Sequence, residues 1–371
     1  MAGLYIHIPF CHSKCAYCDF FSTPKTDSLT DYIGGLKREW DLRKNEIDEP
    51  ITTIYIGGGT PSIIKPDILA KLIEHINPTS LEEMTIEANP EDVTPEWVDA
   101  VTDIGFDRIS MGVQSFDDEQ LALIGRRHTG QQALAAAKLI ISAGMKFNLD
   151  LIYGLPGQDI DSWKRNLDIA LEIMPGHLSA YLLSYEEGTR LWAMRERGKL
   201  TEADDETVFK MYEILASSSR SCGYRHYEIS NFAQPGCEAI HNTNYWLGIP
   251  YIGLGVSAHS FDGRRRRVNP ISINRYIDSL SQGMTVFTID EEDDIDRLND
   301  MIITRLRTDT GLSIAEIKDQ FGGDYAKSLL NAAKPLLENG KLVRPALDTI
   351  AIPESEYLRS DAIMRELIIV H

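Results

Sequence analysis

Three cysteines near the start of the chain, Cys11, Cys15 and Cys18, stand in the pattern C-x3-C-x2-C. Three thiols this close in one loop cannot all be satisfied by a single disulfide bond. Thiolates are the soft anionic ligands that metal ions and iron–sulfur clusters take in proteins. A four-iron cluster normally takes four cysteines, yet the residue two positions after Cys18 is Phe20. The spacing therefore predicts a 4Fe–4S cluster in which one iron is open to a small molecule.

A structural zinc site is the alternative for these thiols, with His7 or His12 as the fourth ligand. Buried free cysteines fit less well, because the three lie in a polar loop. Cys222 and Cys237 stand alone and are expected to be small structural residues. Five cysteines, three of them in one loop, argue for a reducing compartment, so we expect a cytoplasmic protein.

The composition excludes general nucleic-acid binding. The chain has 371 residues, a hydrophobic content of 43% and a formal net charge of −19, whereas nucleic-acid binding needs a basic face. No stretch approaches the length of a membrane span, and no signal peptide is visible. One run, Arg264–Arg267, breaks the acidic pattern. It indicates either a solvated loop or an anion contact, such as propionates or a membrane surface.

Strand-like and helical segments alternate through the first half of the chain. The predicted strands are Leu4–Phe10, Thr52–Gly58, Met84–Ala88, Arg108–Val113, Asn148–Tyr153 and Leu178–Ser184. The predicted helices are Leu29–Asn45, Pro66–Ile76, Pro95–Ile104, Gln131–Ala143 and Ser162–Met174. A repeated strand–helix pattern predicts a parallel sheet with crossover helices. About six units fit, fewer than the eight of a closed barrel, so the pattern favours an open, partial barrel.

Polar groups stand near the ends of these predicted strands. Cys11 follows the first strand, Gly57–Pro61 the second, and Glu87, Gln114 and Asp150 belong to the next three. In a parallel barrel the carboxyl ends of the strands open on one face, where functional sites lie. We therefore expect these groups to meet in one cavity.

The second half of the chain lacks the regular alternation of strand-like and helical segments. Residues 190–225 are helical and charged, His226–Phe232 is a predicted strand, and Gly283–Asp294 resembles an acidic linker. Residues 296–371 predict helix, helix, strand and strand, the order of a small winged-helix-like module. We expect three parts: a barrel at 1–190, an extension at 191–290 and a C-terminal domain at 291–371.

The cysteine motif resembles that of the radical S-adenosylmethionine (SAM) enzymes, whose hallmark is C-x3-C-x-aromatic-C, here with Tyr17 as the aromatic residue. The flank Tyr5–Cys11 narrows the resemblance to the family of oxygen-independent coproporphyrinogen III oxidases and their heme chaperone branch. The resemblance implies an α/β fold, with a partial (β/α)6 TIM-like barrel followed by a small α+β winged-helix-like domain. It also implies a 4Fe–4S cluster and SAM as cofactors.

The resemblance also implies a set of SAM-binding residues. A glycine run at a strand end lets the backbone approach a ligand closely and offers it hydrogen-bonding groups. By similarity, the cofactor contacts are expected at Tyr5, Tyr17, Gly58, Gly59, Thr60, Glu87, Gln114, Arg126 and Asp150. Arg127, next to Arg126, could fill the same role.

Two features separate the oxidases from the chaperone branch. The oxidases carry a fourth cysteine after the motif, where this chain reads Cys18-Asp19-Phe20. The chaperone branch carries H-N-x-x-Y-W, which is matched here by His241, Asn242, Tyr245 and Trp246. Histidine is a good axial ligand for heme iron, and aromatic rings stack on the macrocycle. His241 could also be structural, and His259 is a second candidate ligand.

The interpretation is a heme chaperone that binds heme and transfers it to an acceptor hemoprotein that the sequence does not identify. Whether it is also an enzyme is left open. The alternative function is oxygen-independent oxidative decarboxylation of coproporphyrinogen III. A zinc-stabilised partner-binding protein is a third hypothesis.

Overall fold

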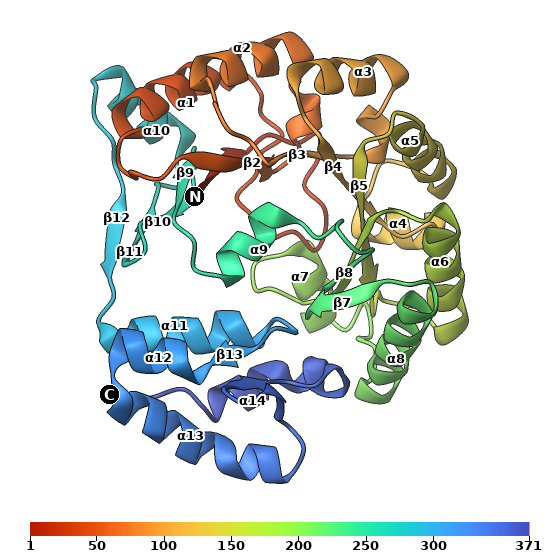
Figure 1. The fold of residues 1–371 in the computed structure, drawn as a ribbon. Coiled ribbons are helices and arrows are strands. Elements are labelled where there is room, and N and C mark those ends of the chain that lie inside the picture. The colour runs from red at the N-terminus through yellow and green to blue at the C-terminus, as the bar shows by residue number, and fades with distance from the viewer. Residues whose placement is uncertain (371) are drawn as a thin grey trace.

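The computed structural model describes residues 1–370, and its body is one large sheet. In this part of the chain twelve strands follow the order β12-β11-β10-β9-β1-β2-β3-β4-β5-β6-β8-β7. The central strands β1 to β6 are parallel to one another. Their bounds are β1 Ala2–Ile8, β2 Ile51–Gly58, β3 Glu83–Ala88, β4 Arg108–Gln114, β5 Lys146–Tyr153 and β6 His177–Leu182. They form an open arc (Figure 1), which confirms the predicted partial barrel.

Helices cover the outer face of this arc (Figure 1). They are α1 Leu29–Arg43, α2 Pro66–Ile76, α3 Pro95–Ile104, α4 Asp118–Ile124, α5 Gly130–Ser142, α6 Ile160–Ile173 and α8 Asp205–Ser221, with single turns η1 Pro61–Ile63 and η2 Pro90–Asp92. Local signals explain their starts: proline opens α2 and α3, Thr129 forms a capping box on α5, and Asp159 caps α6. The sequence pattern missed the short helix α4.

The later part of the chain extends both edges of the same sheet. The predicted strand at 226–232 is a hairpin of β7 Arg225–Glu228 and β8 Asn231–Ala233, in which β8 lies antiparallel to β6. At the other edge β9 Tyr251–Leu254 lies parallel to β1, followed by β10 His259–Phe261, β11 Arg265–Val268 and β12 Thr288–Glu291. The prediction of a linker at 283–294 was therefore wrong over β12. The remaining helices here are α7 Arg190–Glu196, α9 Ile240–Trp246 and α10 Ile273–Ser281.

The arginine run is a strand rather than a solvated loop. Its last three residues belong to β11, which pairs with the acidic strand β12, and Arg264 lies in the exposed bend before it. Arg266 forms ion pairs with Glu292 and Asp300, and Arg267 pairs with Glu46. Arg265 likewise pairs with Asp262. Because acids of this chain already neutralise these guanidinium groups, the structure does not support the alternative of an anion contact.

The C-terminal segment lies across the open side of the arc (Figure 1). It contains α11 Asp294–Leu306, β13 Leu312–Ser313, α12 Ile314–Phe321, α13 Gly323–Glu338, β14 Val343–Ala346, β15 Thr349–Ala351, η3 Glu354–Arg359 and α14 Ser360–Arg365. The order β13-β15-β14 gives the small helix-and-sheet unit that the sequence predicts. Ion pairs join it to both ends of the arc, Arg266–Asp300 at β11 and Arg225–Asp309 at β7. The boundaries at 190 and 290 stay a prediction. No helix within residues 1–370 has the length and apolar character that crossing a bilayer requires.

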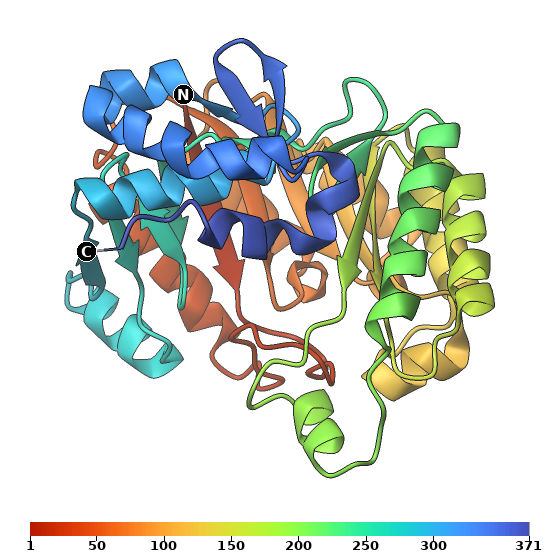
Figure 2. The ribbon, with the colours of Figure 1, turned by 90° about the horizontal axis from the view of Figure 1, so that it is seen from below.

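The cysteine loop lies at the carboxyl ends of the strands, next to α7 (Figure 2). Two backbone hydrogen bonds fix its middle: Ala16 N donates to Ile124 O, and Leu191 N donates to Ala16 O, both at 2.8 Å. A small apolar cluster that includes Ala16, Ile124 and Leu191 packs beneath it. Segments from three parts of the chain therefore position the three thiols.

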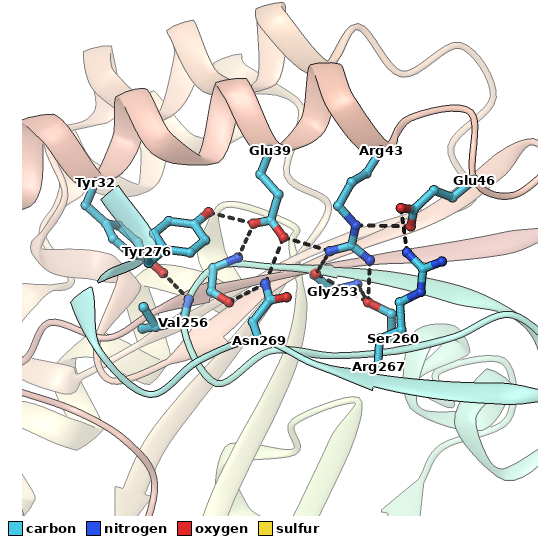
Figure 3. A network of polar contacts seen from close by, with 11 residues as sticks. Tyr32, Glu39, Arg43, Glu46, Gly253, Val256, Ser260, Arg267, Asn269 and Tyr276 are labelled. Carbon is cyan, nitrogen blue, oxygen red and sulfur yellow. Dashed lines mark hydrogen bonds and ion pairs between the residues drawn. The ribbon is translucent and has the colours of Figure 1, made fainter. Parts of the chain in front are cut away.

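A buried ion pair on α1 joins the first strands to the far edge of the sheet (Figure 3). Arg43 Nη1 lies 2.7 Å from Glu39 Oε1, and the two side chains are 1% and 2% exposed. Arg43 also donates to the carbonyl of Gly253 and to Ser260 Oγ, both at 2.8 Å. Glu39 accepts from Asn269 Nδ2 at 2.7 Å, as well as from Gly255 N and Tyr276 Oη. The network ties β9, β10 and α10 to α1.

Breaking this pair should destabilise the whole fold. We predict that Arg43→Met lowers the free energy of unfolding by about 3–5 kcal/mol, because it leaves Glu39 charged and buried. Chemical denaturation measures the change. The matched control is Lys44→Met, since the pair between Lys44 and Asp41 is about half exposed and should contribute less than about 1 kcal/mol. Equal effects of the two substitutions would contradict the prediction.

Candidate functional site

A cavity of about 480 Å³ opens at the carboxyl ends of the parallel strands. It gathers the three cysteines and all but one of the predicted cofactor contacts. Its lining includes Cys11, Cys15, Tyr17, Cys18, Gly58, Gly59, Thr60, Glu87, Gln114, Arg126 and Asp150. Residues as distant in the chain as Cys11 and Asp150 therefore share one space, as the strand-end argument predicts. Tyr5 is not among the described residues that line it.

The three thiols are free and face this cavity. Burial raises the pKa of the Cys11 and Cys18 thiols, so binding a cluster there would release protons. Arg126 Nη1 lies 3.6 Å from Cys15 Sγ, so this guanidinium contacts the cysteine loop directly. Within residues 1–370 no three His, Cys, Asp or Glu side chains surround a point where one metal ion could sit. The three thiols that line the cavity are of the type that iron–sulfur clusters take as ligands.

The glycine run after β2 makes room for close approach of the backbone. Gly58 has φ +115°, a conformation that side chains rarely adopt. A Cβ atom on Gly59 would lie 2.6 Å from the carbonyl oxygen of Phe10, and one on Gly57 would lie 2.7 Å from Glu87 Oε1. Larger residues at these positions would displace the cysteine loop or the Glu87 carboxylate.

Glu87 is held by two hydrogen bonds that cross between strands. Its Oε1 accepts from Tyr55 Oη at 2.8 Å, and its Oε2 accepts from Gly58 N at 3.0 Å. Burial raises the pKa of Glu87 to about 7, against the lowering effect of these hydrogen bonds, and Asp150 adds to the rise. Its carboxylate is thus a fixed acceptor whose charge is poorly compensated until a cation or donor enters the cavity.

Arg126 connects three parts of the cavity wall. Its Nη2 donates to Asn89 Oδ1 at 2.7 Å and to Gly112 O at 2.6 Å, in addition to the contact with Cys15. Gln114, at the end of β4, has φ +67°, an unusual value for a side-chain-bearing residue that is typical of functional sites. Because Arg126 takes all three contacts, Arg127 is not needed for this role.

Asp150 lies within β5, three residues before the strand ends. It accepts from Asn148 Nδ2 at 2.8 Å and from Ser110 Oγ at 3.4 Å. Burial raises its pKa to about 6, although hydrogen bonds to Ser179, Asn148 and Ser110 oppose the rise. The cavity therefore holds two carboxyl groups, from β3 and β5, whose ionised forms are both disfavoured in the absence of a positive ligand.

A second cavity, of about 570 Å³, lies between the sheet edge and the C-terminal segment. Its lining combines aromatic residues of four regions: Tyr5 and His7 of β1, Phe20 of the cysteine loop, Tyr245, Trp246, Tyr251, His259 and Phe261 around α9, β9 and β10, and Phe321 of α12. Tyr5 Oη shares a hydrogen bond of 2.9 Å with His7 Nδ1. Phe20 borders both cavities. The predicted SAM contact Tyr5 thus lies in the wall of the neighbouring cavity.

The H-N-x-x-Y-W residues divide between the core and this second cavity. Tyr245 and Trp246 line it, whereas His241 and Asn242 are not among the described lining residues. His241 is 1% exposed, and its ring bonds Thr53 Oγ1 through Nδ1 and Tyr245 Oη through Nε2, both at 2.8 Å. Burial lowers its pKa to about 3. Direct ligation of heme iron by His241 would require one of these hydrogen bonds to break.

Sequence reasoning missed two residues that position side chains of the first cavity: Asn89 lines it, and Tyr55 contacts it only through Glu87. Asn89 joins Arg126 to Thr60, and Tyr55 orients Glu87. Each could have been found from the two-residue period of a strand. Asn89 follows Glu87 by two positions, and Tyr55 precedes Gly57 by two, so each pair points to the same face of the sheet.

Comparison with known proteins places this architecture in a family. A profile of the radical SAM superfamily matches residues 5–170, and one of the HemN C-terminal domain matches residues 293–345. The heme chaperone HemW of Bacillus subtilis is 33% identical over 349 residues, 92% of each chain. The heme chaperone HemW of Escherichia coli is 38% identical over 268 residues, 69% of each chain. This chain belongs to the radical SAM superfamily and, within it, to the HemW family.

A solved structure supports the same fold for the HemW family member described here. Coproporphyrinogen III oxidase (HemN) from Escherichia coli, a radical SAM enzyme, superposes with a TM-score of 0.84 over 99% of this chain and 90% of that one. At 22% identity the similarity shows the fold alone. Membership of the radical SAM superfamily implies a 4Fe–4S cluster and SAM, which agrees with the thiols and carboxyl groups of the first cavity.

The raised pKa of Glu87 makes a prediction for the ligand-free protein. A carboxyl group whose pKa rises on folding adds stability below its ordinary pKa, and that stability is lost as the pH rises through the folded-state value. For Glu87 this window runs from 4.5 to about 7. Because Glu87→Gln stays neutral, we predict that its melting temperature improves relative to the parent protein as the pH rises through this window.

Glu96→Gln is the matched control. Glu96 lies on the surface of α3, and hydrogen bonds with its own backbone and with Thr94 lower its pKa. Its substitution should therefore give no gain with rising pH. If both variants gain equally, or if the Glu87 variant shows no dependence on pH, Glu87 does not have the raised pKa described above.

Proposed function

We propose that this protein is a heme chaperone, which binds heme and passes it to an acceptor hemoprotein. The observation that carries the proposal is the similarity to HemW proteins along nearly the whole chain, 92% of each chain for the Bacillus subtilis relative. The Mycobacterium tuberculosis relative of the same name adds 34% identity over 326 residues. The aromatic second cavity, bordered by Tyr245 and Trp246, offers a site of suitable size for a large planar ligand.

The first cavity has the residues that a cluster and SAM require. Cys11, Cys15 and Cys18 would hold three irons of a 4Fe–4S cluster. Gly58, Gly59 and Thr60 would offer backbone groups, while Glu87 and Asp150 would accept hydrogen bonds from the amino group and hydroxyls of SAM. When bound, the cluster and SAM supply one-electron chemistry. The chain itself supplies orientation: Arg126 fixes the cysteine loop against Asn89 and Gly112.

The oxidase alternative lacks a supporting observation of its own. The likeness to HemN extends to the fold, and the tripeptide Cys18-Asp19-Phe20 lacks the fourth cysteine expected of the oxidases. In the structure Phe20 is 66% exposed and borders both cavities.

The cluster assignment predicts which cysteines matter. Serine at Cys11, Cys15 or Cys18 should abolish the visible iron–sulfur absorption after anaerobic reconstitution, because each variant loses one ligand. Iron and sulfide analysis provides the second measurement. Cys222→Ser and Cys237→Ser are the controls, since neither thiol lines the first cavity. Loss of iron in either control would contradict the assignment.

The two leading functions predict different behaviour with porphyrins. A heme chaperone should shift the Soret band of added heme and raise the activity of an apo-hemoprotein incubated with it. Under reducing, oxygen-free conditions with SAM it should form no protoporphyrinogen from coproporphyrinogen III. HemN provides the positive control for that assay. Sustained turnover of coproporphyrinogen III without heme binding would replace the chaperone by the oxidase.

A further inference from the structure

The strand β10 presents alternate side chains to opposite sides of the sheet. His259 and Phe261 line the second cavity, whereas Ser260 lies on the other face. This alternation follows from the two-residue period of a strand. Ser260 Oγ is fixed by Arg43 Nη2 at 2.8 Å and by Gly253 N at 2.9 Å (Figure 3). The buried network on α1 therefore sets the direction in which His259 points.

Hydrogen bonding distinguishes His259 from the other histidines. His7, which also lines the second cavity, bonds Tyr5 Oη through Nδ1 and the Phe21 carbonyl through Nε2. Both ring nitrogens of His241 are occupied as well. Each remaining histidine within residues 1–370 except His259 has a ring partner: His12, His75, His128, His177 and His226. Within the described part of the chain, His259 is thus the one imidazole that faces the cavity with both ring nitrogens free.

The protonation of His259 suits ligation to a metal. Burial lowers its pKa, and the charge of Arg266 lowers it further. The neutral imidazole, which is the form that binds iron, is therefore favoured near neutral pH. The acids that face Arg266, Glu292 and Asp300, lie on the same cavity wall and engage this guanidinium rather than His259.

The rest of the lining suits a porphyrin. Trp246, Tyr251, Phe261 and Phe321 supply flat apolar surface from both sides of the cavity. Two buried donors on lining side chains, Trp246 Nε1 and Arg297 Nε, have no acceptor among the described residues. Unpaired buried donors cost free energy, and a carboxylate would relieve that cost once these covered nitrogens turn toward the cavity. Heme combines a planar macrocycle, two carboxylates and an iron that takes imidazole.

We propose that heme binds in the second cavity, between β10 and the C-terminal segment, with His259 as the ligand to its iron. This assignment rests on the proposed heme-chaperone function. In it, Tyr245 and Trp246 border the macrocycle, while His241 stays in the core and holds the hydroxyl of Tyr245. The helices α11 and α12 complete the site, so the C-terminal segment is part of the heme pocket.

The experiment is a titration of the full-length, cluster-loaded protein with hemin, followed by absorption and resonance Raman spectroscopy. His259→Ala should weaken binding by about tenfold or more and change the ligand-sensitive bands, because the iron loses its imidazole. Adding free imidazole to this variant should restore the parent spectrum. A purely structural effect of the substitution would not be rescued in this way.

Two further variants serve as comparisons. His75→Ala removes a partly exposed surface histidine that pairs with Asp41, and it should leave heme affinity and spectrum unchanged. His241→Gln should lower affinity without spectral rescue by imidazole. Unaltered iron–sulfur absorption and SAM affinity in every variant establish that the barrel is folded.

The outcomes separate this assignment from the proposed function. If the parent protein does not bind hemin, the chaperone function fails. If the parent binds and His259→Ala gives the same spectrum and affinity, His259 is not the ligand and only the present assignment is overturned. Imidazole rescue of the His241 variant instead of the His259 variant would also overturn it.

Discussion

The buried ion pair of Glu39 and Arg43 fixes how the two halves of the chain meet. Burial of two charges is tolerated only when further hydrogen bonds satisfy the remaining donors and acceptors. Arg43 meets this demand with Gly253 and Ser260, which lie more than 200 positions later in the chain. The pair therefore specifies one position for β9 and β10 beside β1. Both cavities depend on it, since β1 leads into the cysteine loop and β10 carries the wall of the second cavity.

The inner face of the arc is polar where a closed barrel would be filled with apolar side chains. Tyr5 and His7 of β1, Glu87 of β3 and Asp150 of β5 all project to this face. Such groups are costly to bury, and they lie around open space that ligands can fill. Phe20 borders both spaces, so the cysteine loop forms part of the wall that separates them. Phe20 stands where the oxidases are expected to carry a fourth cysteine, so this wall contains an apolar ring instead of a thiol.

Local sequence signals predicted much of the fold, whereas strand pairings between distant segments could not be predicted from them. The bounds of α2 and α3 match the sequence prediction because proline and capping residues mark their starts. The sequence pattern predicts no strand at β9, because its partner β1 lies at the other end of the chain. The strand character of Arg265–Val268 likewise depends on acids at distant positions. Strand-end residues gave most of the first cavity, since the carboxyl ends of parallel strands meet on one face.

The second cavity shows what a motif can and cannot specify. The residue types of H-N-x-x-Y-W indicate heme chemistry, yet a ligand needs a free nitrogen as well as an imidazole. Both ring nitrogens of His241 are hydrogen-bonded, one to Thr53 and one to Tyr245. These bonds form because α9 packs against β2. No comparable motif surrounds His259. Its side chain faces the cavity because side chains alternate along β10 and because Arg43 holds the neighbouring Ser260 on the opposite face by a hydrogen bond. Hydrogen-bond geometry, rather than residue type, therefore decides which histidine has a ring nitrogen left to offer to the cavity.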